Sequence, residues 1–262
     1  MNLLGEWASW KPEGPPYTLN SDQVVLRLPR SARAIVTKRN WPDAHQASDF
    51  CAPEDRRLHL GLLPQPFLGD LHRASIYVLL LNPGLGPHDY YGEYEVPEFR
   101  KALLANLKQK FKRGSLPFLF LDPQYSWHGG FAWWHAKLTR VIARLVESWA
   151  VPFAIARARL ARELASIELV PYHSPNFRDA GGWIRDLRSA ALARAFVKDI
   201  VLQRVKRGKA IVIVTRQAKV WNLPKHSRIV SYSGQQARAA HLSPDSPGGK
   251  AILSHLLRTN QR

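Results

Sequence analysis

The stretch IYVLLLNPGLGPHDYYGEY, residues 76–94, decides the fold that we expect for this chain. Residues 76–81 form an unbroken apolar run, which is typical of a strand buried on both faces of a parallel sheet. Asn82, Pro83 and Gly84 end the run, because proline cannot donate to a sheet ladder and glycine permits a tight turn. Open α/β sheets bind ligands at the carboxyl ends of such strands. The alternative is an ordinary turn in which asparagine acts as the turn former.

Apolar runs alternate with amphipathic segments along the remaining chain. The runs predict further strands at 167–170, 210–214 and 229–231, and helical spacing predicts helices at 97–111, 133–149, 152–164, 189–204 and 250–257. This alternation predicts a three-layer α/β/α fold with a mostly parallel, four-stranded sheet in a domain at 66–262. Residues 1–65 are irregular and contain short apolar pieces such as QVVLRL. We expect them to form an N-terminal extension, with one or two short strands, packed on that domain.

The composition is strongly basic, with 38 Lys and Arg against 20 Asp and Glu and a formal net charge of +18. Such an excess points to a polyanionic partner, and nucleic acid is the leading candidate. The alternative is a basic composition inherited from an arginine-rich genome.

The single cysteine, Cys51, excludes a disulfide framework and a four-cysteine metal site, and it suits a reducing cytosol. We find no signal-peptide pattern and no apolar segment of membrane-spanning length, so we expect a cytoplasmic protein without a membrane partner.

Motifs of other enzyme classes are missing from the sequence. It has no HExxH, its ten histidines are scattered, and it has no GxSxG. The G-x-G at 84–86 lacks the third glycine of a dinucleotide fingerprint. We therefore expect neither a metal nor a cofactor.

Polar residues follow three of the predicted strands, namely Asn82, His173 and His241. Since the carboxyl ends of parallel strands share one edge of a sheet, we expect these turns to converge on one crevice.

Two of these turns carry a family resemblance. LNPGL at 81–85 follows a buried strand, and HLSP at 241–244 opens a helix after the last strand. In this order they resemble the uracil-DNA glycosylase superfamily over about residues 66–257, closest to its mismatch-specific and single-strand-selective branches. The chain departs from the family at PYH, residues 171–173, where the family often has a base-reading asparagine. The single cysteine also sets it apart from the iron–sulfur branches.

The resemblance implies that Asn82 orients a water through its side-chain carbonyl. An amide is a poor general base, so it positions the water and does not deprotonate it. His241 is the expected donor to the departing base, or else a histidine hydrogen-bonded at a helix start. Asp89 is an acid in the same loop that either assists or is simply solvated.

The same turns supply the expected substrate contacts. Pro83 and Gly84 line the site, while Tyr91 or Tyr90 stacks on a flipped base, with core packing as the alternative. His173 is a candidate for reading a base edge, with a structural role as the alternative. Ser243 and Gly248, at a helix start, are candidates for holding phosphates.

These features together predict a monomeric DNA glycosylase. We expect it to be monofunctional, because no lysine is evidently placed as a Schiff-base nucleophile. It would excise uracil or another deaminated or modified base, in base excision repair or in defence against modified DNA. One alternative is a non-catalytic nucleic-acid-binding protein on the same fold. Another is a small-molecule enzyme of the α/β class, for which the charge is incidental.

Overall fold

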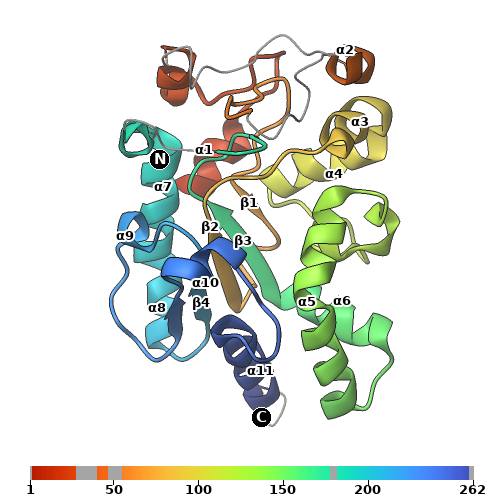
Figure 1. The fold of residues 1–262 in the computed structure, drawn as a ribbon, viewed down its shortest axis with the longest axis vertical. Coiled ribbons are helices and arrows are strands. Elements are labelled where there is room, and N and C mark those ends of the chain that lie inside the picture. The colour runs from red at the N-terminus through yellow and green to blue at the C-terminus, as the bar shows by residue number, and fades with distance from the viewer. Residues whose placement is uncertain (1, 28–39, 47–54, 178–181, 260–262) are drawn as a thin grey trace. The chain divides into compact units, whose positions relative to one another are not determined.

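The computed structural model describes residues 2–27, 40–46, 55–177 and 182–259 (Figure 1). The chain divides into two compact units. Unit 1 comprises residues 1–67, 81–110 and 168–196, and unit 2 comprises residues 68–80, 111–167 and 197–262. No helix within the described ranges is long and apolar enough to cross a membrane.

A five-stranded sheet has the strand order β1-β3-β2-β4-β5. Strand β2 pairs in parallel with β4, and β4 pairs in parallel with β5. Strand β3 also runs parallel to β2. Just before the two strands, the Ser75 amide donates to the Glu163 carbonyl, and just after them, the Val170 amide donates to the Leu81 carbonyl, so both segments advance in the same direction. The strands are β1 (Phe67–Leu68), β2 (Ile76–Leu80), β3 (Leu164–Glu168), β4 (Ile211–Val214) and β5 (Ile229–Ser231).

Strand β1 runs antiparallel to its neighbour β3 and makes the sheet mixed. The amide of Gln65 donates to Pro171 and the amide of Glu168 donates to Pro66, so the two segments run in opposite directions. The predicted α/β class is confirmed, and four parallel strands are present. The expected count of four was wrong, because a two-residue strand is too short to show a periodicity.

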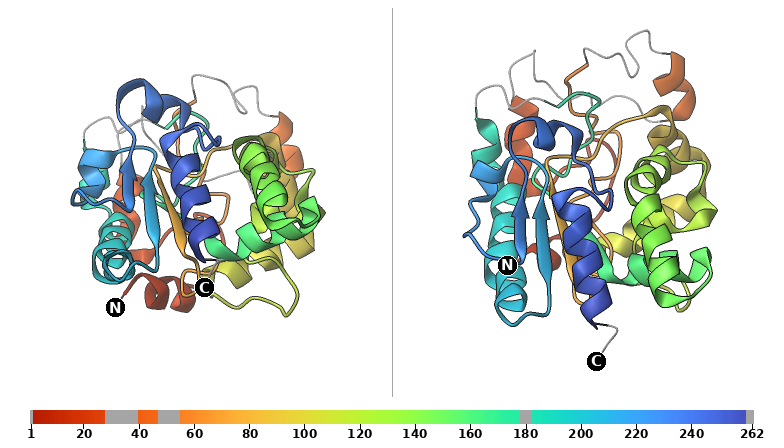
Figure 2. Two further views of the ribbon diagram at one scale, coloured as in Figure 1. Left: turned by 90° about the horizontal axis from the view of Figure 1, so that it is seen from below. Right: turned by 60° about the horizontal axis from the view of Figure 1, so that its bottom comes forward.

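Burial explains why β2 and β4 consist of hydrophobic residues. Ile76 to Leu79 and all four residues of β4 are buried. In unit 2, the helices α8 (Leu202–Lys206) and α11 (Pro247–Thr259) lie on opposite sides of β4 and β5 (Figure 2). A strand covered on both faces has no polar face, which is why the runs lack alternation.

The longest helix of the described ranges is α5 (Gly129–Trp149), which packs against α6 (Phe153–Glu163) and α11 in unit 2. It starts four residues before the predicted position, because the His128 ring accepts a 2.9 Å hydrogen bond from the Gly130 amide and caps the helix. Its buried residues recur at helical spacing: Phe131, Trp134, Leu138, Val141, Ile142 and Leu145. Unit 2 also contains the short helices η3 (Leu119–Leu121), η4 (Pro123–Tyr125), α9 (Ala218–Trp221) and α10 (Gly234–Ala239).

The described N-terminal residues form helices of unit 1 instead of the expected strands. These are α1 (Leu3–Ser9), η1 (Asn20–Arg27) and α2 (Trp41–Gln46); η1 covers most of the QVVLRL piece, whose last residue lies outside the described ranges. The buried Asp22 side chain holds η1 in place. It accepts hydrogen bonds from the Tyr172 hydroxyl (2.7 Å) and the Ser189 amide (3.0 Å). Contacts to such distant positions are invisible in the local pattern of residues 20–27.

Several helix boundaries also differ from the prediction. The segment 87–95, which was expected to be a loop, forms helix α3 (Pro87–Glu95), followed by α4 (Pro97–Leu107). The predicted helix at 189–204 consists of α7 (Arg188–Phe196), a π-helix (Val197–Val201) and α8, and the short 3-10 helix η5 (Trp183–Asp186) precedes it.

We predict that Gly69→Ala destabilises the protein strongly. Gly69 has a φ of +90°, and an added Cβ would lie 2.4 Å from the Leu164 carbonyl oxygen in unit 2. The matched control is Gly114→Ala, at a φ of +86° with open space around the Cβ position. The control should lose about 1 kcal/mol from backbone strain alone, and Gly69→Ala about 3 kcal/mol or more, in chemical denaturation. Equal losses would show that the close approach at Gly69 is unimportant.

Candidate active site

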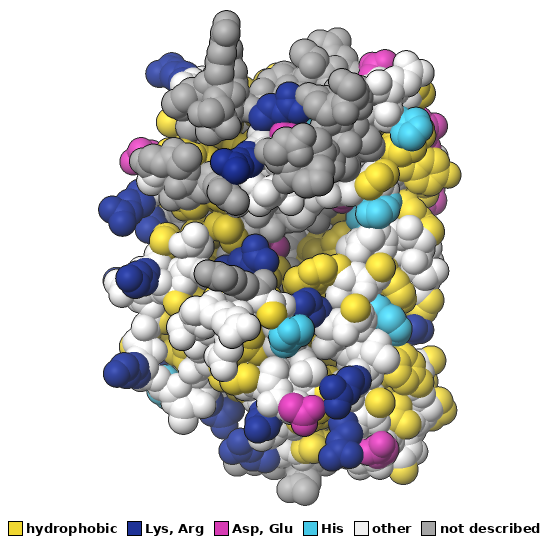
Figure 3. Space-filling view, viewed as in Figure 1, with side chains coloured by type: hydrophobic (Ala, Val, Ile, Leu, Met, Phe, Trp, Pro, Cys, Tyr) yellow, Lys and Arg dark blue, Asp and Glu magenta, His cyan; other side chains and the backbone are white. Residues whose placement is uncertain are grey.

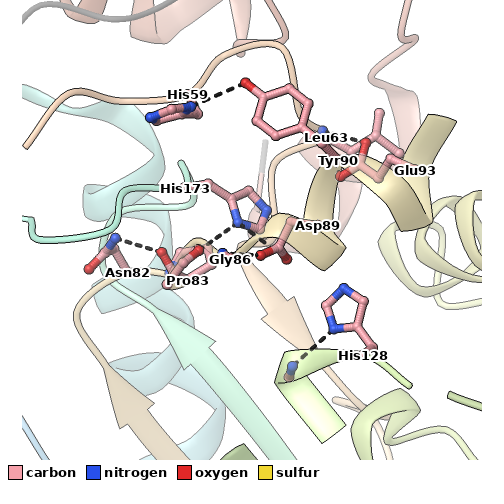
Figure 4. Close-up of polar contacts among 12 residues, drawn as sticks. His59, Leu63, Asn82, Pro83, Gly86, Asp89, Tyr90, Glu93, His128 and His173 are labelled. Carbon is pink, nitrogen blue, oxygen red and sulfur yellow. Dashed lines mark hydrogen bonds and ion pairs between the residues drawn. The ribbon is translucent and has the colours of Figure 1, made fainter. Parts of the chain in front are cut away.

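The turn after β2 holds the Asn82 side chain in a defined orientation (Figure 4). Its Nδ2 donates a 2.6 Å hydrogen bond to the Pro83 carbonyl, which also accepts a 3.4 Å hydrogen bond from the Ser174 amide. In the described part of the chain, no donor bonds to Oδ1 of Asn82, and the residue is half-buried. The amide is therefore anchored through its nitrogen, while its carbonyl oxygen can accept a hydrogen bond from a bound molecule.

His173 lies beside this turn, within unit 1, and is buried. Its Nδ1 donates a 2.8 Å hydrogen bond to the Gly84 carbonyl, and its own carbonyl accepts one of 2.8 Å from the His59 amide. Burial lowers the pKa of His173, and the Asp89 carboxylate and the Gly84 carbonyl act in the opposite direction. The ring is thus held as a neutral imidazole with its proton on Nδ1, and its observed contacts fix the turn.

Asp89 is a helical residue and not the loop acid that was expected. It lies in the first turn of α3, where its carboxylate accepts a 2.7 Å hydrogen bond from the Gly86 amide. One carboxylate oxygen also lies 3.9 Å from Nδ1 of His173. The residue is buried, and its carboxylate caps α3 and faces an imidazole. These contacts are structural and leave the predicted assisting role untested.

The two tyrosines of α3 have opposite environments. Tyr90 is fully buried and packs with Ala44 and Leu62, whereas Tyr91 is 43% exposed. Neighbouring residues of a helix point about 100° apart, so one of the pair faces the core and the other faces solvent. Only Tyr91 of the two offers a face on which a base can stack without unpacking the core.

A buried polar network that sequence reasoning missed lies behind α3. The Tyr90 hydroxyl is 3.2 Å from Nδ1 of His59, and Nε2 of His59 is 3.0 Å from the Asp55 carboxylate. Burial alone would raise the pKa of Asp55, but hydrogen bonds from His59 and Arg57 hold it below its ordinary value. No motif in the sequence marks these residues, because their partners come together only in the fold.

Glu93, one turn after Asp89 on α3, is a second buried acid that the sequence did not indicate. Its carboxylate accepts hydrogen bonds of 2.9 and 3.1 Å from the Leu63 amide and one of 3.2 Å from Arg100. Burial raises the pKa of Glu93 to about 8, although both donors favour its charged form. The carboxylate therefore ties the 55–67 segment to α3.

The second predicted motif lies in unit 2. The His241 side chain is exposed, and its carbonyl accepts a hydrogen bond from the Tyr232 hydroxyl. The same hydroxyl accepts a 2.9 Å hydrogen bond from the Gly248 amide, and the Ser243 carbonyl accepts one of 2.9 Å from the Ser246 amide. The Gly248 amide, a predicted phosphate contact, is therefore already used inside the protein. The expectation that His241 shares a pocket with Asn82 stays a prediction.

Groups of three or more His, Cys, Asp or Glu side chains arranged to hold a metal ion are not found among the described residues. Comparison with protein families, with curated proteins and with solved structures finds no match to the chain. The assignment of function therefore rests on the residues themselves.

We predict that the lowered pKa of His173 makes the protein less stable in mild acid. Its pKa in the folded state is lowered from the ordinary value of 6.5, so below that value the unfolded chain binds the proton and the folded protein does not. Stability should therefore fall as the pH decreases through about 6.5 towards the folded-state pKa. His173→Asn keeps a donor near the Nδ1 position but cannot titrate.

The measurement is the free energy of unfolding of wild type and of His173→Asn between about pH 7.5 and pH 5. The difference between the two proteins isolates His173 from His255, whose pKa is also lowered, to about 4, by burial. Parallel pH profiles of the two proteins would contradict this prediction.

Proposed function

We propose that this protein is a monofunctional DNA glycosylase that releases uracil or another deaminated or modified base by hydrolysis of the N-glycosidic bond. The observation that carries the proposal is the anchored amide of Asn82, whose Oδ1 is available at the carboxyl end of β2. A flipped nucleotide needs such a fixed acceptor, because the attacking water must be oriented towards C1′ of its sugar.

The reaction separates bond breaking from water attack. The bond between C1′ and the base nitrogen breaks first, and the electron pair leaves with the base while the sugar becomes oxocarbenium-like. Asn82 Oδ1 accepts a hydrogen bond from the water, whose oxygen then bonds to C1′. The proton that the water loses passes to solvent or to the departing base. An amide suffices for this step because the cationic sugar needs no strong nucleophile.

The surrounding residues have distinct roles in this proposal. His173 and Asp89 hold the turn, through the Gly84 carbonyl and the Gly86 amide. Tyr91 provides the stacking face, since Tyr90 belongs to the core. His241 donates to the departing base and offsets its negative charge.

The net charge of +18 supports a DNA partner in this proposal. Lys and Arg side chains are spread over the face seen in Figure 3, on which Asp and Glu are sparser. A non-catalytic nucleic-acid-binding protein shares this charge, so only an activity measurement separates it from a glycosylase.

We predict that Asn82→Ala slows base release about a hundred-fold, because the water loses its positioning acceptor. Asn82→Asp keeps an acceptor oxygen and should retain more activity than the alanine variant. His241→Ala should slow the reaction to a similar degree. The measurement is single-turnover release from oligonucleotides carrying a panel of deaminated bases, followed by alkali cleavage of the abasic sites.

The first control is the melting temperature of each variant, which should stay near wild type because no large apolar group leaves the core. The second is DNA affinity, which Asn82→Ala should spare because the phosphate contacts lie elsewhere, and which His241→Ala should weaken only slightly. Near-wild-type rates for Asn82→Ala and His241→Ala would refute the site assignment. Tight binding without release across the panel would instead favour the non-catalytic alternative.

We also predict that DNA affinity falls steeply with salt, because bound phosphates release counterions from the strand. Titration of a labelled duplex at several salt concentrations should give a linear decrease of log affinity against log salt, with a slope of about −0.9 for each phosphate contact. A flat response would show that the charge excess does not serve DNA binding.

A further inference from the structure

Residues 200–244 of unit 2 form a strongly basic part of the chain. No Asp or Glu occurs between Asp199 and Asp245, whereas Lys and Arg recur throughout this stretch. It includes α8, β4, α9, β5 and α10. Such a stretch either forms a solvated surface or binds a polyanion, and the arrangement of its cations distinguishes the two.

The turn that ends α8 carries three of these cations. Lys206, Arg207 and Lys209 surround Gly208, which has a φ of +71°, and their side chains are exposed. The amides of Gly208 and Lys209 each donate a 2.9 Å hydrogen bond to a carbonyl of α8. These bonds close the helix, so the three cations project from a fixed turn.

A fourth cation, Arg228, lies over this turn and comes from another element. It directly precedes β5, and a Cβ added to Gly208 would lie 3.5 Å from its Nη2. The residue is half-buried, and its carbonyl accepts a 2.9 Å hydrogen bond from the Val212 amide of β4. The dipole of α8 favours cations on the last turn of that helix, but it does not account for a guanidinium group brought there by a different strand.

Helix α11 also contacts the Arg228 side chain. Nη1 of Arg228 lies 3.4 Å from Nδ1 of His255. The last turn of α11, in dark blue, lies at the end of the sheet where β4 and β5 begin (Figure 2). Burial lowers the pKa of His255 to about 4, so the ring is neutral at physiological pH. His255 therefore orients the guanidinium group without offsetting its charge.

These cations have no carboxylate partner in the part of the chain that the structure describes. By contrast, two exposed cations of α5 in the same unit are paired: Arg140 lies 3.1 Å from Asp245, and Arg144 lies 3.2 Å from Glu147. Unpaired like charges held close together repel one another, and bound anions relieve that repulsion. We call this group the basic corner, and it consists of Lys206, Arg207, Lys209 and Arg228.

We propose that the basic corner binds the phosphate backbone of a nucleic-acid duplex, at a site separate from the Asn82 turn. The corner lies where β4 and β5 begin, and β2 runs parallel to β4, so the carboxyl end of β2 belongs to the opposite edge of the sheet. The corner offers cations but no Trp, Tyr or Phe, whereas single strands bind where aromatic rings accompany cations. Contacts to phosphates alone hold a duplex without reading its sequence. Such a site goes beyond base release and does not depend on it.

The test uses the full chain and a labelled, undamaged duplex of about twelve base pairs, with fluorescence anisotropy at several salt concentrations. The double variant Arg207→Gln with Lys209→Gln removes two exposed cations and should bind on the order of ten-fold more weakly. Its salt slope should fall by about 1.8, because each lost phosphate contact removes about 0.9. Arg228→Gln should lower the slope by about 0.9, whereas Arg228→Lys keeps the charge and should stay near wild type.

The matched control is the double variant Arg140→Gln with Arg144→Gln, which removes two exposed cations that are already paired. It should change the affinity less than about two-fold. Equal losses in the two double variants would overturn the proposal, because net charge alone would explain both. Melting temperatures check folding, and the variant at Arg207 and Lys209 tests the corner even if Arg228→Gln fails to fold.

Two other anionic partners test the choice of a duplex. One is a single strand with the same number of phosphates, and the other is a vesicle that contains anionic phospholipid. We expect the variant at Arg207 and Lys209 to lose more affinity for the duplex than for either of them. A loss confined to the single strand or to the vesicle would overturn the choice of a duplex.

Base release from a lesion panel is measured in parallel. If wild type releases a base but the corner variants bind the undamaged duplex as wild type does, the corner is refuted and the glycosylase stands. If wild type releases no base but the corner variants lose affinity as expected, the corner stands and the glycosylase fails. A wild type that does not bind the duplex refutes the corner.

Discussion

The hydrogen bond from the buried His173 ring to the Gly84 carbonyl is the interaction on which the candidate site depends. It joins the segment after β3 to the turn after β2, and both segments belong to unit 1. The bond requires a proton on Nδ1, and burial keeps the ring neutral by lowering its pKa. Asp89 faces the same nitrogen and also caps α3. The His173 ring therefore lies between the turn that follows Asn82 and the start of helix α3. A neutral donor suits this position, since an isolated buried charge would cost far more to desolvate.

Unit 1 contains further buried polar groups besides this bond. His59 lies between Asp55 and the Tyr90 hydroxyl, and Glu93 binds the Leu63 amide. Buried polar groups stabilise a fold only when they are hydrogen-bonded, and a network that is satisfied also specifies one arrangement of its segments. The network therefore gives α3 a defined register, which a purely apolar contact would specify less strictly. A rigid support of this kind suits a site in which one amide must hold a water in place.

Unit 2 contributes a different kind of chemistry. Its sheet brings Arg228, which precedes β5, over the turn after α8, where the other cations of the basic corner lie. In the proposed function both units contribute, since Asn82 of unit 1 positions the water and His241 of unit 2 donates to the departing base.

The sequence by itself determined the α/β class and the strands β2 and β4, because an unbroken apolar run is typical of a strand covered on both faces. It also placed Asn82 at the end of β2, since the Pro83-Gly84 pair cannot continue a ladder. Only the tertiary structure decided that Tyr90 is buried while Tyr91 is exposed, that Asp89 belongs to a helix, and that the Gly248 amide is already bonded to Tyr232. The burial and pairing of a side chain depend on segments far away along the chain, and a local pattern of residues contains no record of them.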